Sequence, residues 1–113
     1  MDVRTYAEAA SLDVLVPGEA GRTIEGGYCG DLLSWVMGRA QAGDAWITVM
    51  GNVNAVAVAV LADVACIVLA ENAPLDEDAR ERAASEGVPV LRSSRQAYPL
   101  ALELGRLLEE TAH

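Results

Sequence analysis

Few side chains in this chain could carry out chemistry. The only histidine is His113, the last residue, there is no lysine, and the two cysteines, Cys29 and Cys66, are far apart in sequence. A histidine-based triad, a histidine metal site, a P-loop lysine and a Schiff base therefore lack their essential residue in the body of the chain. The cysteines form neither a CxxC pair nor a zinc-ligand pattern. We expect no catalytic residue, no metal and no cofactor.

The stretch from Gly26 to Asp31, GGYCGD, is the first candidate site. Paired glycines before a helix can bring backbone amides close to a phosphate, and a cysteine at such a position can be reactive. Asp31 opposes both readings, because a carboxylate at the helix start would cap the same amides and would raise the pKa of the thiol. We expect a tight turn at Gly26-Gly27, a helix capped by Asp31, and Cys29 as a small buried side chain.

The second candidate site is the edge of the predicted sheet where three strands end. Ligands of open parallel sheets bind at the carboxyl ends of the strands, and two arginines near a helix start suit a carboxylate, a phosphate or a nucleotide. The alternative is that the amides and hydroxyls only cap helices while the arginines offset an acidic surface. The residues of this predicted rim are Asn52, Asn54, Glu71, Asn72, Arg92, Ser93, Ser94 and Arg95.

The elements that position these residues follow from periodicity and from turn signals. Short β-rich segments at 45–50, 64–70 and 88–93 alternate with helical patterns, and Ser93 or Ser94 is expected to cap the closing helix. Residues 44–110 thus predict a β-α-β-α-β-α order, which implies an α/β fold with a mostly parallel central sheet. Residues 2–10 predict a short helix, and 12–18 and 22–25 predict irregular strands.

The segment 53–70 requires a choice between structures. Its first half, AVAVAVLAD, alternates like a strand, but Asn52 or Asn54 is a good helix cap and the flanking parallel strands need a crossover. We therefore predict a helix followed by a buried strand. The same segment nearly reaches the length of a membrane span, but Asn54 and Asp63 interrupt it, and we expect none.

The charge balance excludes several partners. The chain has 17 acidic residues against 8 arginines, a formal net charge of −9. Such a surface repels nucleic acids and anionic membranes, because no basic patch can release enough counterions. No export signal is recognised at the N-terminus, and we expect a cytoplasmic protein with both thiols reduced.

The sequence RTIEGGYCGDLLS at 22–34, followed by WIT at 46–48 and NAVAVA at 54–59, resembles the DRTGG domain, in particular its small stand-alone members. Gly21 stands in the place of the aspartate of that name, and Ile24-Glu25 separates Arg22-Thr23 from Gly26-Gly27. The positions that carry the resemblance, and that could form an interface, are Arg22, Thr23, Gly26, Gly27, Tyr28, Asp31, Leu32, Ser34 and Trp35.

The resemblance implies a regulatory or dimerising module without catalytic machinery, similar in fold to the N-terminal domains of HPr kinase and of Mur ligases. It also implies a larger redox or metabolic protein as a possible partner. We expect one domain over residues 1–113 that forms a homodimer through the helix from Asp31, with Trp35 as an interface residue. The alternative is a sensor that binds an anionic metabolite or nucleotide at the rim.

Overall fold

A computed structural model of the chain describes residues 1–111, so His113 lies outside the described residues. Five helices and five strands alternate along most of it. The helices are α1 (Val3–Ala9), α2 (Leu33–Arg39), α3 (Val53–Ala62), α4 (Glu77–Glu86) and α5 (Ala97–Thr111). The strands are β1 (Asp13–Val16), β2 (Gly26–Cys29), β3 (Asp44–Thr48), β4 (Cys66–Leu69) and β5 (Val90–Arg92).

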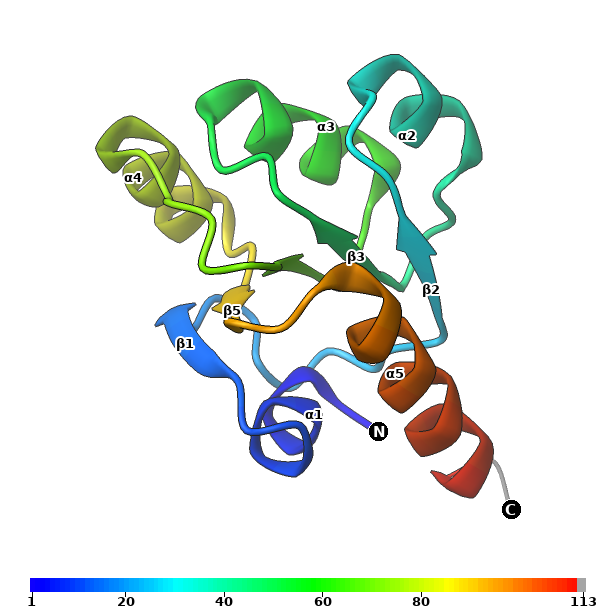
Figure 1. Cartoon of the computed structure of the whole chain (residues 1–113). Helices are drawn as coiled ribbons and strands as arrows, with labels where there is room; N and C mark the ends of the chain where they lie inside the picture. Colours follow the sequence, from blue (N-terminus) through cyan, green and yellow to red (C-terminus); the bar gives the residue numbers. More distant parts are fainter. Residues whose placement is uncertain (112–113) are drawn as a thin grey trace.

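The strands form one sheet in the order β1-β5-β4-β3-β2. Strands β2 to β5 are parallel, and only the edge strand β1 runs antiparallel to its neighbour, β5. The predicted α/β class with a mostly parallel sheet is therefore confirmed. Helices α2, α3 and α4 cover one face of the sheet, while α1 and α5 cover the other (Figure 1).

Each face of the sheet has its own hydrophobic core. Tyr6, Ile47 and Leu100 belong to the cluster on the α1/α5 face, and Trp46 and Val56 to the cluster on the α2/α3/α4 face. Strands β3 and β4 are buried along their whole length, as expected for central parallel strands with helices on both sides. Cys66, in β4, is fully buried as predicted.

Local signals explain where the helices begin and end. A carboxylate oxygen of Asp2 accepts a hydrogen bond from a backbone amide of α1, and the side-chain amide oxygen of Asn52 accepts one from a backbone amide of α3, so that Asn52, and not Asn54, caps α3. Helix α4 ends at Gly87, whose φ of +73° is left-handed. Pro99 lies in the first turn of α5, where its missing amide costs no hydrogen bond. In the described part of the chain no helix is long and apolar enough to cross a membrane.

Candidate functional site

The prediction of a turn at Gly26-Gly27 is wrong, because both glycines lie inside β2. They pair in parallel with Asp44 and Ala45 of β3. A Cβ on Gly26 would lie 2.8 Å from a carboxylate oxygen of Asp44, and a Cβ on Gly27 would lie 2.7 Å from a methyl group of Leu104 in α5. The glycines thus allow close packing along the strand, and they do not form a loop that could hold a phosphate.

The prediction that Asp31 caps the following helix is also wrong. The capping position of α2 is Leu32, which makes no side-chain cap bond. One carboxylate oxygen of Asp31 accepts instead from the Thr48 hydroxyl at 2.7 Å and from the Val49 amide at 2.9 Å. Asp31 therefore ties the β2–α2 loop to the end of β3. The two partners are 17 and 18 positions away from Asp31 in the sequence. A local capping pattern gives no indication of such distant contacts.

Cys29 is exposed, contrary to the prediction of a buried side chain. It lies at the end of β2, in a shallow groove beside α5 that Ala101, Leu104 and Gly105 also line. Partial desolvation by this groove raises the pKa of the thiol, and the Asp31 carboxylate raises it further, as predicted. The thiolate is the reactive form, so this cysteine is a weak nucleophile despite its exposure.

The remaining groups offer little for catalysis. Burial raises the pKa of the Cys66 thiol to about 12, which keeps it protonated. The Tyr6 hydroxyl is buried without a hydrogen-bond partner in the described chain, and desolvation raises its pKa too. Within residues 1–111, no three His, Cys, Asp or Glu side chains lie close enough together to hold a metal ion.

The predicted rim divides into two parts, because the helices that follow its strands lie on opposite faces of the sheet (Figure 1). Asn52 caps α3, and Asn54 is exposed in the first turn of that helix. Ser93, Ser94 and Arg95 lead instead to α5 on the other face. The facing arrangement of two helix starts that the sequence predicts is therefore not formed.

Five of the eight predicted rim residues do come together, in a polar hollow of about 520 Å³. These five are Asn72, Arg92, Ser93, Ser94 and Arg95. The other wall is made by the end of α1, by Ser11 in the turn after it, by Asp13 at the start of β1 and by Glu103 of α5. We call this cavity the polar hollow. These contributions are absent from the sequence-based prediction, since the antiparallel pairing of β1 with β5 brings α1 and β1 here and the ion pair with Arg95 holds Glu103 of α5 here.

Arg95 is held by its neighbours. Its Nη2 atom donates to the Ala10 carbonyl at 2.8 Å and to Glu103 Oε1 at 2.9 Å. The Ser93 hydroxyl accepts from the Arg95 amide at 3.1 Å. The prediction that Ser93 or Ser94 caps α5 is wrong, because the helix begins only at Ala97. Arg95 thus joins α1 to α5 and has limited capacity for a ligand.

Glu71 and Asn72 form the turn that follows β4. Both have left-handed φ angles, +57° and +54°, and Ala73 N donates to the Ala70 carbonyl across the turn at 3.0 Å. The Glu71 and Asn72 amides donate to the carbonyls of Arg95 and Ser93. This pairing orders the loop after β5. It also places Asn72 at the wall of the polar hollow, whereas Glu71 is exposed and does not line the hollow.

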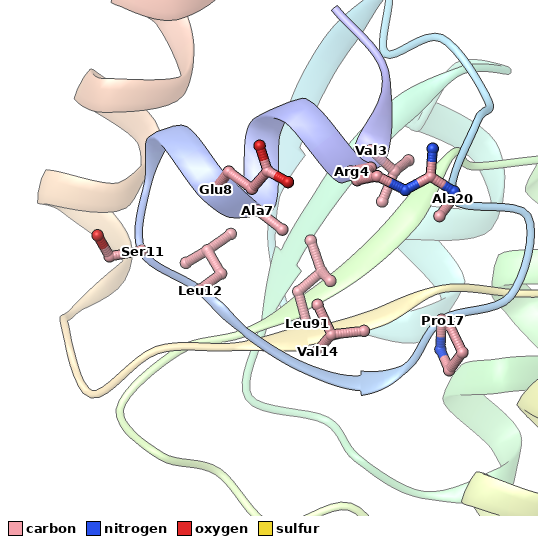
Figure 2. Close-up of a pocket in the computed structure, with 10 residues that line it drawn as sticks. All are labelled: Val3, Arg4, Ala7, Glu8, Ser11, Leu12, Val14, Pro17, Ala20 and Leu91. Atoms are coloured by element: carbon pink, nitrogen blue, oxygen red, sulfur yellow. The ribbon is translucent and has the colours of Figure 1, made fainter.

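A second hollow, which the sequence does not indicate, lies between α1 and β1 and measures about 410 Å³. Figure 2 shows Leu12, Val14 and Leu91 beneath α1, with Pro17 near one end and Ser11 near the other. Its charged lining residues are Arg4 and Glu8, both exposed on α1. It is thus mostly apolar.

The outer flank of α2 carries exposed apolar side chains. Trp35 is 52% exposed and Leu32 is 57% exposed, and the Arg39 guanidinium lies 3.7 Å from the centre of the Trp35 ring. Val49 is also exposed, and its amide donates to the carboxylate of Asp31, the residue before Leu32. We call Leu32, Trp35, Arg39 and Val49 the α2 patch. Trp46, by contrast, is fully buried, and its indole donates to the Gly30 carbonyl.

The other residues that carry the family resemblance have structural positions. Arg22 forms an ion pair with Asp63 at 2.7 Å, and Thr23 makes a single antiparallel bridge with Asp2. Tyr28 is half-buried in β2, and Ser34 is exposed on α2. None of the four lines the polar hollow.

The DRTGG domain family matches residues 29–107, which is more than half of the chain. The chain belongs to the DRTGG domain family. The match begins at Cys29, so the glycine pair and Arg22-Thr23 lie before it, and the helices and strands from α2 to α5 carry the likeness. DRTGG domains are regulatory domains, and the resemblance inferred from the sequence is confirmed.

A solved structure agrees with this DRTGG fold. The crystal structure of the CBS and DRTGG domains of the regulatory region of Clostridium perfringens pyrophosphatase, complexed with its activator diadenosine tetraphosphate, superposes with a TM-score of 0.66 at 10% identity. The likeness covers 89% of this chain but only 44% of that chain, and at this identity it shows the fold alone. No curated protein matches this DRTGG chain.

Proposed function

We propose that this DRTGG protein is a homodimeric regulatory module whose subunits meet through the α2 patch. The observation that carries the proposal is the exposure of Leu32 and Trp35 on the flank of one short helix. Large apolar side chains that gather on a surface mark contact sites, and tryptophan and arginine are enriched among the residues that contribute most to binding at interfaces. A two-fold contact would bury the same patch of both copies.

The position of the patch supports this proposal. Helix α2 follows β2, the edge strand of the sheet, so the apolar flank adjoins an edge whose backbone groups are available for pairing. The two charged side chains here already have partners: the Arg39 guanidinium lies over the Trp35 ring, and one carboxylate oxygen of Asp31 accepts from Thr48 and Val49. A second copy would thus meet the apolar side chains of the patch without having to neutralise a charge that has no partner.

The test is the mass of the protein in solution. Light scattering at micromolar concentration is expected to give twice the 11.9 kDa of the chain, and a Leu32→Ser/Trp35→Ser double variant is expected to give a monomer. Leu61→Ser is the matched control, because Leu61 is 70% exposed on α3, outside the patch, and this variant should remain dimeric. A monomeric wild-type protein, or a double variant that stays dimeric, would show the proposal to be wrong.

The proposal includes a single domain over residues 1–113 and a larger metabolic or redox protein as partner, in the cytoplasm. Val3, Tyr6 and Leu12 lie outside the family match but share one core cluster with β3, β4 and α5, which supports a single unit. The pyrophosphatase domain of the same fold belongs to the regulatory region of an enzyme, which supports a role as a regulatory component.

A second candidate function is a ligand sensor, and a specific observation favours it. Arg92 lines the polar hollow, and its Nε atom is buried with no hydrogen-bond partner among the described residues. Buried polar atoms are nearly always satisfied, so an unmatched arginine beside a cavity favours a bound anionic group. The related regulatory region was crystallised with a nucleotide activator, which is why a nucleotide is one ligand class to test.

A further inference from the structure

The polar hollow contains charges of both signs, and their pairing leaves one of each unused. Arg92 and Arg95 contribute two cations, while Asp13 and Glu103 contribute two anions. Arg95 pairs with Glu103 at 2.9 Å, and Arg106 approaches the second oxygen of Glu103 at 3.8 Å. Arg92 and Asp13 therefore remain as the available pair.

Arg92 and Asp13 are neighbours that do not neutralise each other. They are directly opposed in the register between β5 and β1, yet in residues 1–111 no ion pair joins them to each other or to another side chain. A guanidinium binds a carboxylate through two parallel hydrogen bonds, and a carboxylate binds an ammonium group. A molecule that carries both groups a few bonds apart would satisfy both residues at once.

Charge balance disfavours a polyphosphate in this hollow. The four charged side chains cancel, and the whole chain has a net charge of −9, so several phosphate charges would find one available guanidinium in a negative field. A ligand of zero net charge avoids this repulsion. The hydroxyl of Ser94 and the side-chain amide of Asn72, both exposed in the wall, add neutral hydrogen-bonding groups.

We propose that the polar hollow binds a free α-amino acid, with its carboxylate on Arg92 and its ammonium group on Asp13. This inference rests on the sensor function, the second candidate above, and gives that sensor its ligand class. Ala9 and Ala10 at the end of α1 leave space for a small side chain, and the volume of about 520 Å³ exceeds what one small amino acid needs.

Calorimetry on the full chain tests the ligand class with complete and half ligands. The probes are glycine, L-alanine, L-serine and L-asparagine, with propionate and propylamine as half ligands and AMP and ATP as nucleotides. At least one amino acid is expected to bind at least about tenfold more tightly than propionate and propylamine, a factor that corresponds to about 1.4 kcal/mol. If none of the four amino acids binds more tightly than propionate, the zwitterion assignment is wrong.

Two variants separate the roles of the charges. Arg92→Gln is expected to lower the affinity for both the amino acid and propionate by about tenfold or more. Asp13→Asn should lower only the affinity for the amino acid and leave or improve propionate binding. Arg82→Gln, on the exposed face of α4, is the matched control and should change neither affinity. If Asp13→Asn leaves amino-acid binding intact, the assignment of the ammonium group is wrong.

A second measurement keeps the proposal testable if Arg92→Gln does not fold. In NMR spectra of the wild-type protein, the bound amino acid is expected to shift the amide resonances of Ser11, Asn72 and Ser94, which line the hollow. It should not shift the amide resonance of Gly38 on α2. Binding of AMP or ATP without binding of amino acids would overturn the ligand class but support the sensor function. Binding of none of the probes would overturn both and leave the dimer proposal intact.

Discussion

At the scale of single residues, Asp31 has the most consequences. Its carboxylate joins the β2–α2 loop to the end of β3 through the Thr48 hydroxyl and the Val49 amide, and its charge also helps to raise the pKa of the Cys29 thiol. The same residue thus stabilises a loop and reduces the reactivity of a cysteine. Exposure alone would suggest a reactive thiol at Cys29; the desolvated groove and the nearby carboxylate act in the opposite direction.

Alkylation rates test this account of Cys29. Iodoacetamide is expected to modify Cys29 more slowly than free cysteine at neutral pH, because a raised pKa leaves less thiolate. Asp31→Asn keeps an oxygen acceptor for Thr48 but removes the charge, so the pH at which alkylation reaches half its maximal rate should fall. Glu81→Gln on α4 is the control and should not move that pH. An unchanged profile in Asp31→Asn would contradict the electrostatic contribution.

At the scale of elements, close approaches of the backbone decide which helices can pack. The clearest case is Gly51, in the loop between β3 and α3. A Cβ there would overlap the Pro74 carbonyl oxygen and lie 2.9 Å from the carbonyl carbon, and the Gly51 carbonyl accepts from the Asp76 amide. This contact between two loops holds the starts of α3 and α4 side by side on one face of the sheet (Figure 1).

Substitution of Gly51 by alanine is therefore expected to destabilise the protein. The obstacle is backbone, which cannot move aside cheaply, so the free energy of unfolding should fall by about 1–3 kcal/mol in urea titrations. Gly105→Ala is the matched control: nothing lies within 4 Å of a Cβ there, and alanine in a helix should stabilise by about 0.5–1 kcal/mol. A neutral Gly51→Ala would show that the two loops do not pack as described.

At the scale of the whole molecule, contacts distant in sequence unite the N-terminal third with the rest. Arg22 donates through Nη1 to the Asp63 carboxylate at 2.7 Å and through Nη2 to the Asp63 carbonyl at 2.8 Å. It thereby clamps the end of α3, where Asp63 has a left-handed φ of +59°. On the other face, Arg95 links α1 to α5. Both arginines therefore hold the first 25 residues against the family-matched region.

The Arg22–Asp63 pair makes part of the stability depend on pH. The Arg22 guanidinium lowers the pKa of the Asp63 carboxyl in the folded state. The stability that the pair contributes is therefore fully present above the pKa of the same group in the unfolded chain, near 3.8, and is lost as the pH falls through the folded-state pKa. The pair is half exposed, so Asp63→Asn should cost less than about 1 kcal/mol at pH 7 and less still near pH 3.

Urea unfolding of the wild-type and variant proteins between pH 3 and pH 7 measures this difference. Glu109→Gln on α5 serves as the control, because Glu109 is exposed and forms no ion pair within the described part of the chain. Its stability difference from the wild type should not follow the same pH course. A cost of Asp63→Asn that stays constant down to pH 3 would show that the charge of Asp63 is not the cause.

The sequence by itself determined the order and type of most elements and the classes of chemistry that are missing. Periodicity and caps predict α3 in spite of its alternating alanines and valines, and the unbroken apolar run of β4 predicts a central strand, because both signals act over a few neighbouring residues. The absence of lysine and of an internal histidine is likewise a property of composition alone.

Only the tertiary structure decided where the functional groups lie relative to one another. Gly26-Gly27 has the composition of a turn, yet pairing with β3 and the approach of Leu104 place it in a strand. Asn52 follows β3 and Arg92 ends β5, two strands that lie on either side of β4, yet the helices after them lie on opposite faces. Asp13 comes to Arg92 through the antiparallel pairing of β1 with β5. Such contacts depend on chain topology, to which local propensities are insensitive.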